Sequence, residues 1–557
     1  MVPVPQRHEN RLQIANCALI FAMVIASALP YVFGLGFYVD DWSYFAALEH
    51  SSGQGMVAMF RELAGTDPNL LTRPVDTACF VLGYKIFGLH STPYHVTTAG
   101  VVGLAAVLLY LVLSELRIGR WLAFAIALIF GLLPHYSTDR FLVSSHQNAL
   151  CMVFAMLGIY ALLRADRSGE KHPAKWVCLA VPALVLSILS YEAAIGLILA
   201  GFGIAGWRRI SGFRGLSKRN LANLGSIIAA IAMFLVVWMA KARMQREVVY
   251  HHHFLALLGG RSWHAIIQAA LFNFWTYGLH LPSVLIRLYR DSALNLVAMS
   301  VAAVIALIVA AYLWRYMEPS AIPSRFVCLR LIVAGFVFFG LGYALFFTAI
   351  PNFNSPGIDN RLAIASAPGA ACVLVAIAGL ACSVVKNSAL RVRAFAIVIA
   401  AICGANSLVV SGVGFFWVDA ASQQRTILSS VAAHVHSLPH RSELLLDGFC
   451  PWFGPSFVFT YSWDTTSAIR LTLNDESLNA DVVPSDLPHD ASGVISFFPQ
   501  QGIVYSYSNK LFLYDVQRQT VTSLPSVQAA NAYSRAMPPT RESGCPVSKK
   551  GASEEIF

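Results

Sequence analysis

The chain has 557 residues, of which 57% are hydrophobic and only 12% are charged. Soluble domains carry about 25% charged residues, so this composition excludes a soluble globular protein and indicates an integral membrane protein. The formal net charge of +10 does not indicate nucleic-acid binding, because the basic residues gather in short loops between apolar segments, as expected for a protein oriented by positive charge on its inner side.

The first apolar run extends from about Leu12 to Gly36 and follows Arg7 and Arg11. At about 25 residues it is long enough to span a bilayer, which predicts an uncleaved helix with the N-terminus inside. A long polar loop is expected to follow on the outer side, to about Thr92.

Two adjacent carboxylates, Asp40 and Asp41, come a few residues after this first span. Ionisable groups at a membrane boundary are costly, so they tend to be retained for a function. The alternative is that Asp41 caps the N-terminus of a short surface helix over Trp42 to Glu49. The pair alone does not decide between these two interpretations.

Hydropathy and loop charge predict about 11 spans, with the C-terminus outside. The segment 264–290 is apolar enough for a span, but its aromatics and histidines favour a helix along the outer interface, which leaves the later basic loops inside. The spans after the first are expected at about 93–114, 120–134, 147–164, 175–191, 193–206, 221–241, 293–314, 326–349, 362–384 and 394–416.

The chain changes character after the last span. Alternating runs at Ser456–Tyr461 and Ile503–Tyr507 predict strands, and Ser508-Asn509 predicts a hairpin turn. We therefore expect a transmembrane domain over 1–416, a small extracytoplasmic α/β or β-rich domain over 417–525, and a polar tail over 526–557. Three cysteines lie outside the spans, and two of them can pair in an oxidising compartment: Cys79, Cys450 and Cys545.

This topology gathers charged and polar residues from four loops at the outer face: Asp40, Asp41, Arg73, His135, Asp139, Arg140, His146, Glu192, Asp359 and Arg361. A transporter more often places such groups near the middle of the membrane, in broken helices related by internal repeats. No repeat is evident here. A cluster at one membrane surface suits chemistry on a lipid headgroup.

Four short motifs follow one another along the chain. The first is Asp40-Asp41, and the second is Thr72-Arg73-Pro74-Val75 with Tyr84–Leu89 and Tyr94-His95. The third is Leu133-Pro134-His135 and Asp139 with Ser190-Tyr191-Glu192, and the fourth is Asp359-Asn360-Arg361 before Leu362–Gly369. In this order they resemble the motifs of the GT-C glycosyltransferases that use polyprenyl-phosphate sugars. The chain is most similar to the transmembrane O-mannosyltransferases that carry tetratricopeptide repeats and to their bacterial relatives. The resemblance covers about residues 1–416. Departures are the missing repeats, Tyr191 where the family often has Lys, and Leu362 where it often has Tyr.

The resemblance implies an all-α polytopic GT-C-like enzyme of the plasma (inner) membrane, with its active site on the outer side. Its donor would be a polyprenyl-phosphate monosaccharide in the membrane, its acceptor an unidentified protein, lipid or polysaccharide, and the reaction would invert the anomeric centre. Two alternatives stay open: a polysaccharide polymerase or ligase using a lipid-diphosphate donor, and a transporter of lipid-linked sugars.

This chemistry assigns roles to the clustered residues. Asp40 or Asp41 can take the proton of the acceptor hydroxyl, and the other can orient the acceptor or hold a divalent cation such as Mg or Mn. Arg361 and Arg73 can stabilise the departing phosphate with forked donors, and Glu192 can position the acceptor or tune an arginine. Supporting roles around the acceptor are expected for three further residues: His135, Asp139 and His146.

Each role has a plainer alternative. Arg361 and Arg73 can be anchors that reach toward lipid headgroups. Glu192 can merely end a helix, and the two histidines above can serve as loop hydrogen-bonding groups. The run His251–His253 resembles a metal site, but adjacent side chains rarely converge on one ion, so we expect an exposed loop there.

Overall fold

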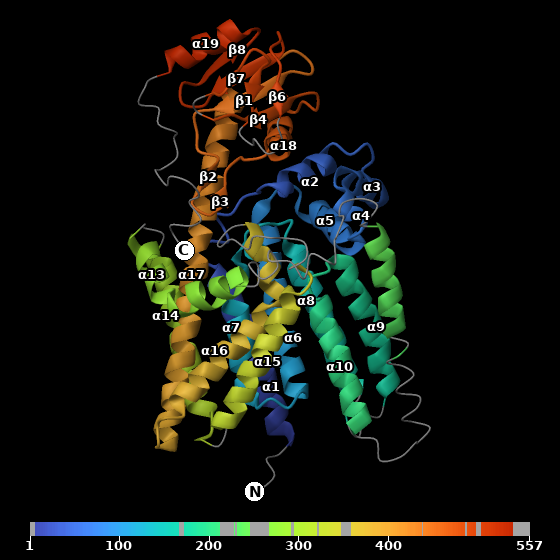
Figure 1. The fold of residues 1–557 in the computed structure, drawn as a ribbon, viewed down its shortest axis with the longest axis vertical. Coiled ribbons are helices and arrows are strands. Elements are labelled where there is room, and N and C mark those ends of the chain that lie inside the picture. The colour runs from blue at the N-terminus through green and yellow to red at the C-terminus, as the bar shows by residue number, and fades with distance from the viewer. Residues whose placement is uncertain are drawn as a thin grey trace.

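The computed structural model describes residues 6–165, 167, 172–211, 228, 231–244, 267–290, 294–319, 322–346, 358–436, 438–484, 487–496 and 503–537. Long helices run side by side in one bundle, and a small sheet-containing domain stands beyond one end of it (Figure 1). The histidine run and the C-terminal half of the predicted tail lie outside the described residues.

Seven of the described helices are long and apolar enough to cross a membrane: α1 (Gln6–Ala28), α6 (Ser91–Glu115), α8 (His146–Ala165), α9 (Pro173–Ser190), α14 (Leu296–Tyr316), α15 (Arg325–Tyr343) and α17 (Ser388–His434). The pair α7 (Arg120–Leu132) and η1 (Pro134–Arg140), bent by 54°, gives an eighth. A polytopic, mostly helical membrane protein is thereby confirmed. The lower count than the predicted 11 reflects the shorter apolar helices α10 (Ile195–Ser211) and α16 (Ala367–Cys382), and the partly described 221–241.

Helix α7 forms the centre of the bundle. Its sequence is apolar on every side, and every residue from Trp121 to Leu132 is buried. A helix that is hydrophobic all round is stable only when neighbours surround it. Because η1 continues directly from α7, the polar residues of η1 are held at the core of the bundle rather than at its rim.

Two shorter elements fall in the segment 264–290: the π-helix η3 (Leu271–Leu279) and α13 (Leu281–Arg290). Neither is a candidate span. Figure 1 shows α13 inclined to the long helices, near the end of the bundle that carries the C-terminal domain. Only Val284 and Leu288, one turn apart, are buried on α13, as expected for an amphipathic helix along an interface.

The expected long loop after the first span is instead helical. It contains α2 (Asp40–Glu49), α3 (Met56–Thr66), α4 (Pro68–Leu71) and α5 (Pro74–Phe87). An aromatic cluster that includes Phe37, Phe45, Phe80 and Tyr94 holds these helices together. Helix α2 agrees with the alternative of a surface helix over Trp42 to Glu49, although Asp41 does not cap it, because the N-cap is Val39 and no side chain caps the helix. The prediction of a loop missed the other three helices, because polar residues on the exposed faces of short helices resemble loop residues in a hydropathy profile.

The C-terminal domain begins later than residue 417, because α17 runs unbroken for 47 residues to His434. Its four-stranded sheet has the order β4-β1-β7-β8, with β1 parallel to both neighbours and β7 antiparallel to β8. The strands are β1 (Glu443–Asp447), β4 (Asn479–Val482), β7 (Leu511–Asp515) and β8 (Thr520–Ser523), and the helices are α18 (Ser462–Leu473) and α19 (Val527–Ala536).

The hairpin predicted at Ser508-Asn509 was wrong. The short strand β6 (Val504–Tyr505) pairs with β5 (Val494–Ile495), whereas β7 turns into β8. The run 456–461 likewise contributes only β3 (Ser456–Phe457), paired with β2 (Trp452–Phe453). The alternation of apolar and polar residues located short strands in both runs. It did not show which strands pair with them, since strand pairing depends on segments far apart in sequence.

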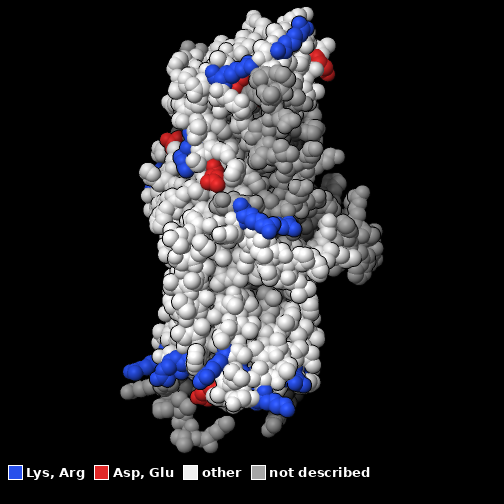
Figure 2. All heavy atoms as spheres, turned by 90° about the vertical axis from the view of Figure 1, so that its left-hand side faces the viewer, with Lys and Arg blue, Asp and Glu red and all other residues white. Residues whose placement is uncertain are grey.

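Charge is distributed unevenly along the bundle. Figure 2 shows lysines and arginines gathered at the end opposite the C-terminal domain, then a broad band almost free of charge. Arg117, Arg164, Arg208 and Arg325 belong to loops or helix ends predicted to be cytoplasmic, at this same end of the bundle. We call this the basic end, and the end that carries the C-terminal domain the domain end.

Candidate active site

The two aspartates of the opening pair have different surroundings. Asp41 is fully buried and accepts hydrogen bonds from the backbone N–H groups of Tyr38 (3.1 Å), Val143 (3.2 Å) and Ser144 (2.7 Å). Burial raises the pKa of Asp41 to about 7, against the lowering effect of these donors. Its carboxylate therefore connects the start of α2 to the loop after η1.

Asp40, the first residue of α2, is only partly buried. Its Oδ1 accepts a hydrogen bond from Nε1 of Trp463 on α18 at 3.2 Å, so the C-terminal domain reaches the carboxylate. Burial raises the pKa of Asp40, whereas the nearby charge of Arg361 lowers it. The preceding Val39 has φ of +47°, a strained conformation for a β-branched residue. The two aspartates therefore have different roles. Asp40 is a candidate general base, whereas Asp41 holds the local backbone in place through hydrogen bonds.

Arg361 lies in the 3₁₀ helix η6 (Ile358–Ala365), which is fastened to η1 by side-chain amides. Asn360 accepts from the N–H of Thr138 at 3.0 Å and donates to Oγ of Ser137 at 3.0 Å. Asn148 donates to the carboxylate of Asp139 at 2.7 Å and to the carbonyl oxygen of Arg361 at 3.3 Å. These hydrogen bonds hold the backbone of Arg361 in place and thereby restrict where its guanidinium can lie.

A second charged group joins three segments that are far apart in sequence. Glu192 forms ion pairs with Arg73 and with Lys241, each at 2.9 Å, through its two carboxylate oxygens. The guanidinium of Arg73 also lies over the ring of Tyr191, 4.3 Å from its centroid. Burial raises the pKa of Glu192, but the two cations outweigh that effect and hold it well below its ordinary value. Glu192 is thus a buried, charged partner of Arg73.

Lys241 and Asp76 belong to this region and were missed by the sequence analysis. Asp76 is fully buried one turn after Arg73, and neither of its carboxylate oxygens has a hydrogen-bond partner among the described residues. Nδ1 of His146 lies 3.5 Å from Oδ1 of Asp76. Burial raises the pKa of Asp76 to about 7, although Arg73 and Lys241 lower it. A buried carboxylate with no hydrogen bond is costly, which marks it as a candidate functional group.

The other predicted site residues take supporting positions. His135 is buried, and its Nε2 lies 2.9 Å from the carbonyl oxygen of Asn273 in η3. Arg140 donates to the carbonyl of Gly131 at 2.5 Å, and its guanidinium faces the ring of Tyr136. Both residues therefore fasten η1 to its neighbours. The side chain of Asp359 lies outside the described structure.

Both oxygens of Asp41 accept backbone N–H groups, which leaves Asp40 as the more accessible carboxylate of the predicted metal-binding pair. Within the described ranges, no group of three or more His, Cys, Asp or Glu side chains is arranged to hold a metal ion. Any cation bound through Asp40 would need a different set of ligands, so a metal requirement stays a prediction.

Comparisons with known proteins give little beyond the geometry. No family model and no curated protein matches the chain. Two solved structures do, both of ArnT from Cupriavidus metallidurans. The structure bound to undecaprenyl phosphate covers 84% of this chain and 85% of its own, at 15% identity and a TM-score of 0.36. The apo structure covers 91% and 93%, at 14% identity and a TM-score of 0.37. Since both TM-scores lie below 0.5, the likeness is recorded without further conclusion.

Proposed function

We propose that this integral membrane protein is a glycosyltransferase that moves a sugar from a polyprenyl-phosphate donor to an acceptor hydroxyl at the domain end of the bundle. The observation that carries the proposal is that Asp40, a partly exposed carboxylate hydrogen-bonded by Trp463, lies within electrostatic reach of the Arg361 guanidinium. Asp40 and Arg361 are more than 300 positions apart in the sequence. Proton acceptance and phosphate stabilisation are the two functions that such a transfer requires.

The reaction can be written with these residues alone. Asp40 takes the proton of the acceptor hydroxyl as its oxygen attacks the anomeric carbon of the donor. The bond between that carbon and the phosphate oxygen breaks, and polyprenyl phosphate leaves with the electron pair. Arg361 donates forked hydrogen bonds to the departing phosphate, whose negative charge grows as the bond breaks. Attack opposite the leaving group inverts the anomeric centre.

The buried group around Glu192 supports this step from one side. Two cations, Arg73 and Lys241, face a single strongly acidic carboxylate. The arrangement keeps Arg73 fixed in orientation, and it supplies positive potential to a site that must receive an anionic lipid phosphate. The pKa of Asp76 is raised to about 7, so this carboxyl group lowers the positive potential when it is deprotonated.

We assign the domain end to the outer, extracytoplasmic side of the membrane. The opposite end carries the gathered lysines and arginines, as expected for cytoplasmic loops (Figure 2). Cys450, in the C-terminal domain, is disulfide-bonded, and disulfides persist in oxidising compartments outside the cytoplasm. Both features favour the same orientation.

The direct test is mass spectrometry of surface glycans and glycoproteins from cells that contain the wild-type protein, the Asp40→Asn variant, or neither. We expect one sugar modification that needs the protein and is absent with Asp40→Asn at equal protein level. Purified protein should also convert a synthetic polyprenyl-phosphate sugar to polyprenyl phosphate when extracted membranes supply the acceptor. Identical glycans in all three cultures, with no donor consumption, would contradict the proposal.

A further inference from the structure

A pocket at the basic end lies far from the candidate active site. It has a volume of about 440 Å³ and is lined by Glu115 and four arginines: Arg117, Arg164, Arg167 and Arg208. They come from the C-terminal ends of α6, α8 and α10 and from the turns that follow. Among the described residues that line it, four guanidinium groups meet one carboxylate, so the described lining is mainly cationic.

Glu115 organises these arginines. Its Oε1 lies 2.8 Å from Nη1 of Arg164 and 3.5 Å from Nη1 of Arg167, while its carbonyl oxygen accepts from Nη2 of Arg208 at 3.0 Å. The guanidinium of Arg164 also lies over the ring of Trp176, 5.6 Å from its centroid. Glu115 therefore brings Arg164, Arg167 and Arg208 together at one pocket, a convergence that cations serving only to orient the chain do not need.

The backbone at Arg117 gives an independent indication. Arg117 follows the last turn of α6 with φ of +59°, the left-handed conformation that usually takes glycine at the end of a helix. Its N–H bonds to the carbonyl of Ser114 and the N–H of Ile118 to that of Leu113, which closes the turn. An arginine is thus held where glycine would be less strained, and its side chain lines the pocket.

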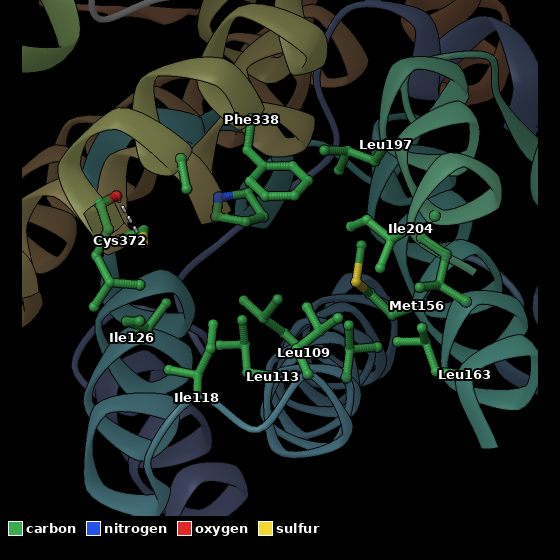
Figure 3. Close-up of a pocket in the computed structure, with 17 residues that line it drawn as sticks. Leu109, Leu113, Ile118, Ile126, Met156, Leu163, Leu197, Ile204, Phe338 and Cys372 are labelled. Carbon is green, nitrogen blue, oxygen red and sulfur yellow. Dashed lines mark hydrogen bonds between the residues drawn. The ribbon is translucent and has the colours of Figure 1, made fainter. Parts of the chain in front are cut away.

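An apolar cavity adjoins the arginine pocket and shares Leu163 with it. Figure 3 shows this cavity, lined by apolar side chains from α6, α7, α8, α10, α15 and α16. Along the chain, Leu116 precedes Arg117, Leu163 precedes Arg164, and Ile204 lies one helical turn before Arg208. On α6, α8 and α10 an apolar side chain that lines the cavity is thus followed, within one turn, by an arginine that lines the pocket. An anionic lipid, with its charged headgroup next to an apolar chain, matches this change.

We propose that the arginine pocket binds the phosphate of an anionic phospholipid from the cytoplasmic leaflet. The adjoining apolar cavity, of about 90 Å³, has room for only the first few methylene groups of one acyl chain. Guanidinium groups suit this headgroup because they donate paired hydrogen bonds to phosphate oxygens and stay charged at every physiological pH. Basic pockets between membrane helices on the cytoplasmic side are established sites for anionic lipids. This site is separate from sugar transfer and does not depend on it.

The test uses delipidated full-length protein and measures lipid retention by native mass spectrometry and thermal unfolding. The probes are phosphatidylglycerol, phosphatidylcholine, polyprenyl phosphate and glycerol 3-phosphate. We expect phosphatidylglycerol alone to be retained and to raise Tm. Arg164→Gln and Arg208→Gln should each weaken its binding about tenfold or more, since each removes charge-assisted hydrogen bonds to phosphate.

Arg117→Gly keeps the test decisive if the other variants fold poorly. Glycine suits the left-handed backbone, so this variant should unfold at the same temperature or higher without lipid, yet bind phosphatidylglycerol more weakly. Lys386→Gln, an exposed lysine in the loop between α16 and α17, is the matched control and should bind normally. Equal binding of glycerol 3-phosphate, preferential retention of polyprenyl phosphate, or normal phosphatidylglycerol binding by the arginine variants would each overturn the proposal.

Discussion

The two ends of the bundle hold charged residues in opposite ways. At the domain end, Lys241 is only 3% exposed, Arg73 and Glu192 are each 14% exposed, and their ion pairs join distant segments. At the basic end, Arg164 is 28% exposed and Arg167 is 55% exposed, and among the described residues both pair with the same carboxylate, that of Glu115. One end thus buries charge of both signs, whereas the other displays charge of one sign.

This difference separates two reasons for charge in a membrane protein. Exposed cations orient the chain and attract anionic headgroups at low cost, because water still solvates them. Buried charges lose that solvation, and the loss is only partly offset by their ion pairs. A chain retains such an arrangement when it serves chemistry, so substitutions at the domain end should affect catalysis far more than equal substitutions at the basic end.

The largest effect is expected for Asp40→Asn. If Asp40 is the base, the amide cannot accept the proton, and transfer should fall by roughly 100-fold or more. Asp41→Asn should instead lower Tm, because an amide offers only one acceptor oxygen to three backbone donors. Turnover by the folded Asp41 variant should stay within about fivefold of wild type, since general-base loss alone accounts for larger falls.

The matched control for this experiment is Lys386→Gln, which removes a charge at the basic end and should leave the transfer rate unchanged. Donor consumption by purified proteins measures all three variants. A normal rate for Asp40→Asn would remove the proposed base, and with it the functional contrast between the two ends.

Arg361 comes next in expected effect. Arg361→Ala removes the guanidinium and should lower transfer by roughly 100-fold, the range found for single groups that stabilise developing negative charge. Arg361→Lys keeps the charge but loses the forked geometry, so an intermediate fall of about tenfold is expected. Arg391→Gln, at the start of α17, is the control at the basic end. If Arg361 only anchored η6 to lipid headgroups, both Arg361 variants would transfer sugar at the wild-type rate with unchanged Tm.

Much of this architecture could be predicted from the sequence. Apolar length and loop charge predicted most of the helices and gathered the polar loops at one surface, because both signals reflect transfer between water and lipid. The same signals could not find where α17 ends, since its last turns are more polar but stay helical to His434. Hydropathy reports contact with lipid and not the end of a helix.

The finer structure of the site depended on contacts between distant segments. Asp40 and Asp41 are equivalent in sequence and differ only because the N–H groups of Val143 and Ser144 meet one of them. Lys241 was read as the end of a span, and its pairing with Glu192 has no local signal. Asp76 did have a local signal, because it lies three residues after Arg73, at the spacing of one helical turn. The signal was not used because this region was expected to be a loop.

The pH dependence of Tm shows how much the burial of the charged Asp76 carboxylate destabilises the folded protein. Its pKa is raised to about 7 in the folded protein, above the ordinary value near 4 of an unfolded chain. The folded state therefore favours the protonated form, and this contribution to stability is full below about pH 4 and is lost as pH rises toward 7. Asp76→Asn resembles the protonated form, so its Tm should fall less than the wild-type Tm between pH 4 and 7. Glu62→Gln, on the exposed face of α3, should keep the wild-type profile. Superimposable profiles for Asp76→Asn and wild type would show that burial of this carboxylate carries no cost.

The smallest effect is expected for Trp463→Phe, which tests whether the C-terminal domain belongs to the site. The substitution keeps an aromatic ring but removes the N–H that donates to Asp40 at 3.2 Å. That hydrogen bond lowers the pKa of Asp40 against the raising effect of burial, so its loss should raise the pKa further. Because a general base must be deprotonated, the rise of transfer rate with pH should move to higher pH, with a loss of about threefold near neutrality and recovery in alkaline buffer. Trp452→Phe, in the short strand β2 of the same domain, is the control. A pH profile that matches wild type would mean that α18 only covers the site, and a uniform loss at every pH would mean that Trp463 positions the domain and leaves the titration of Asp40 untouched.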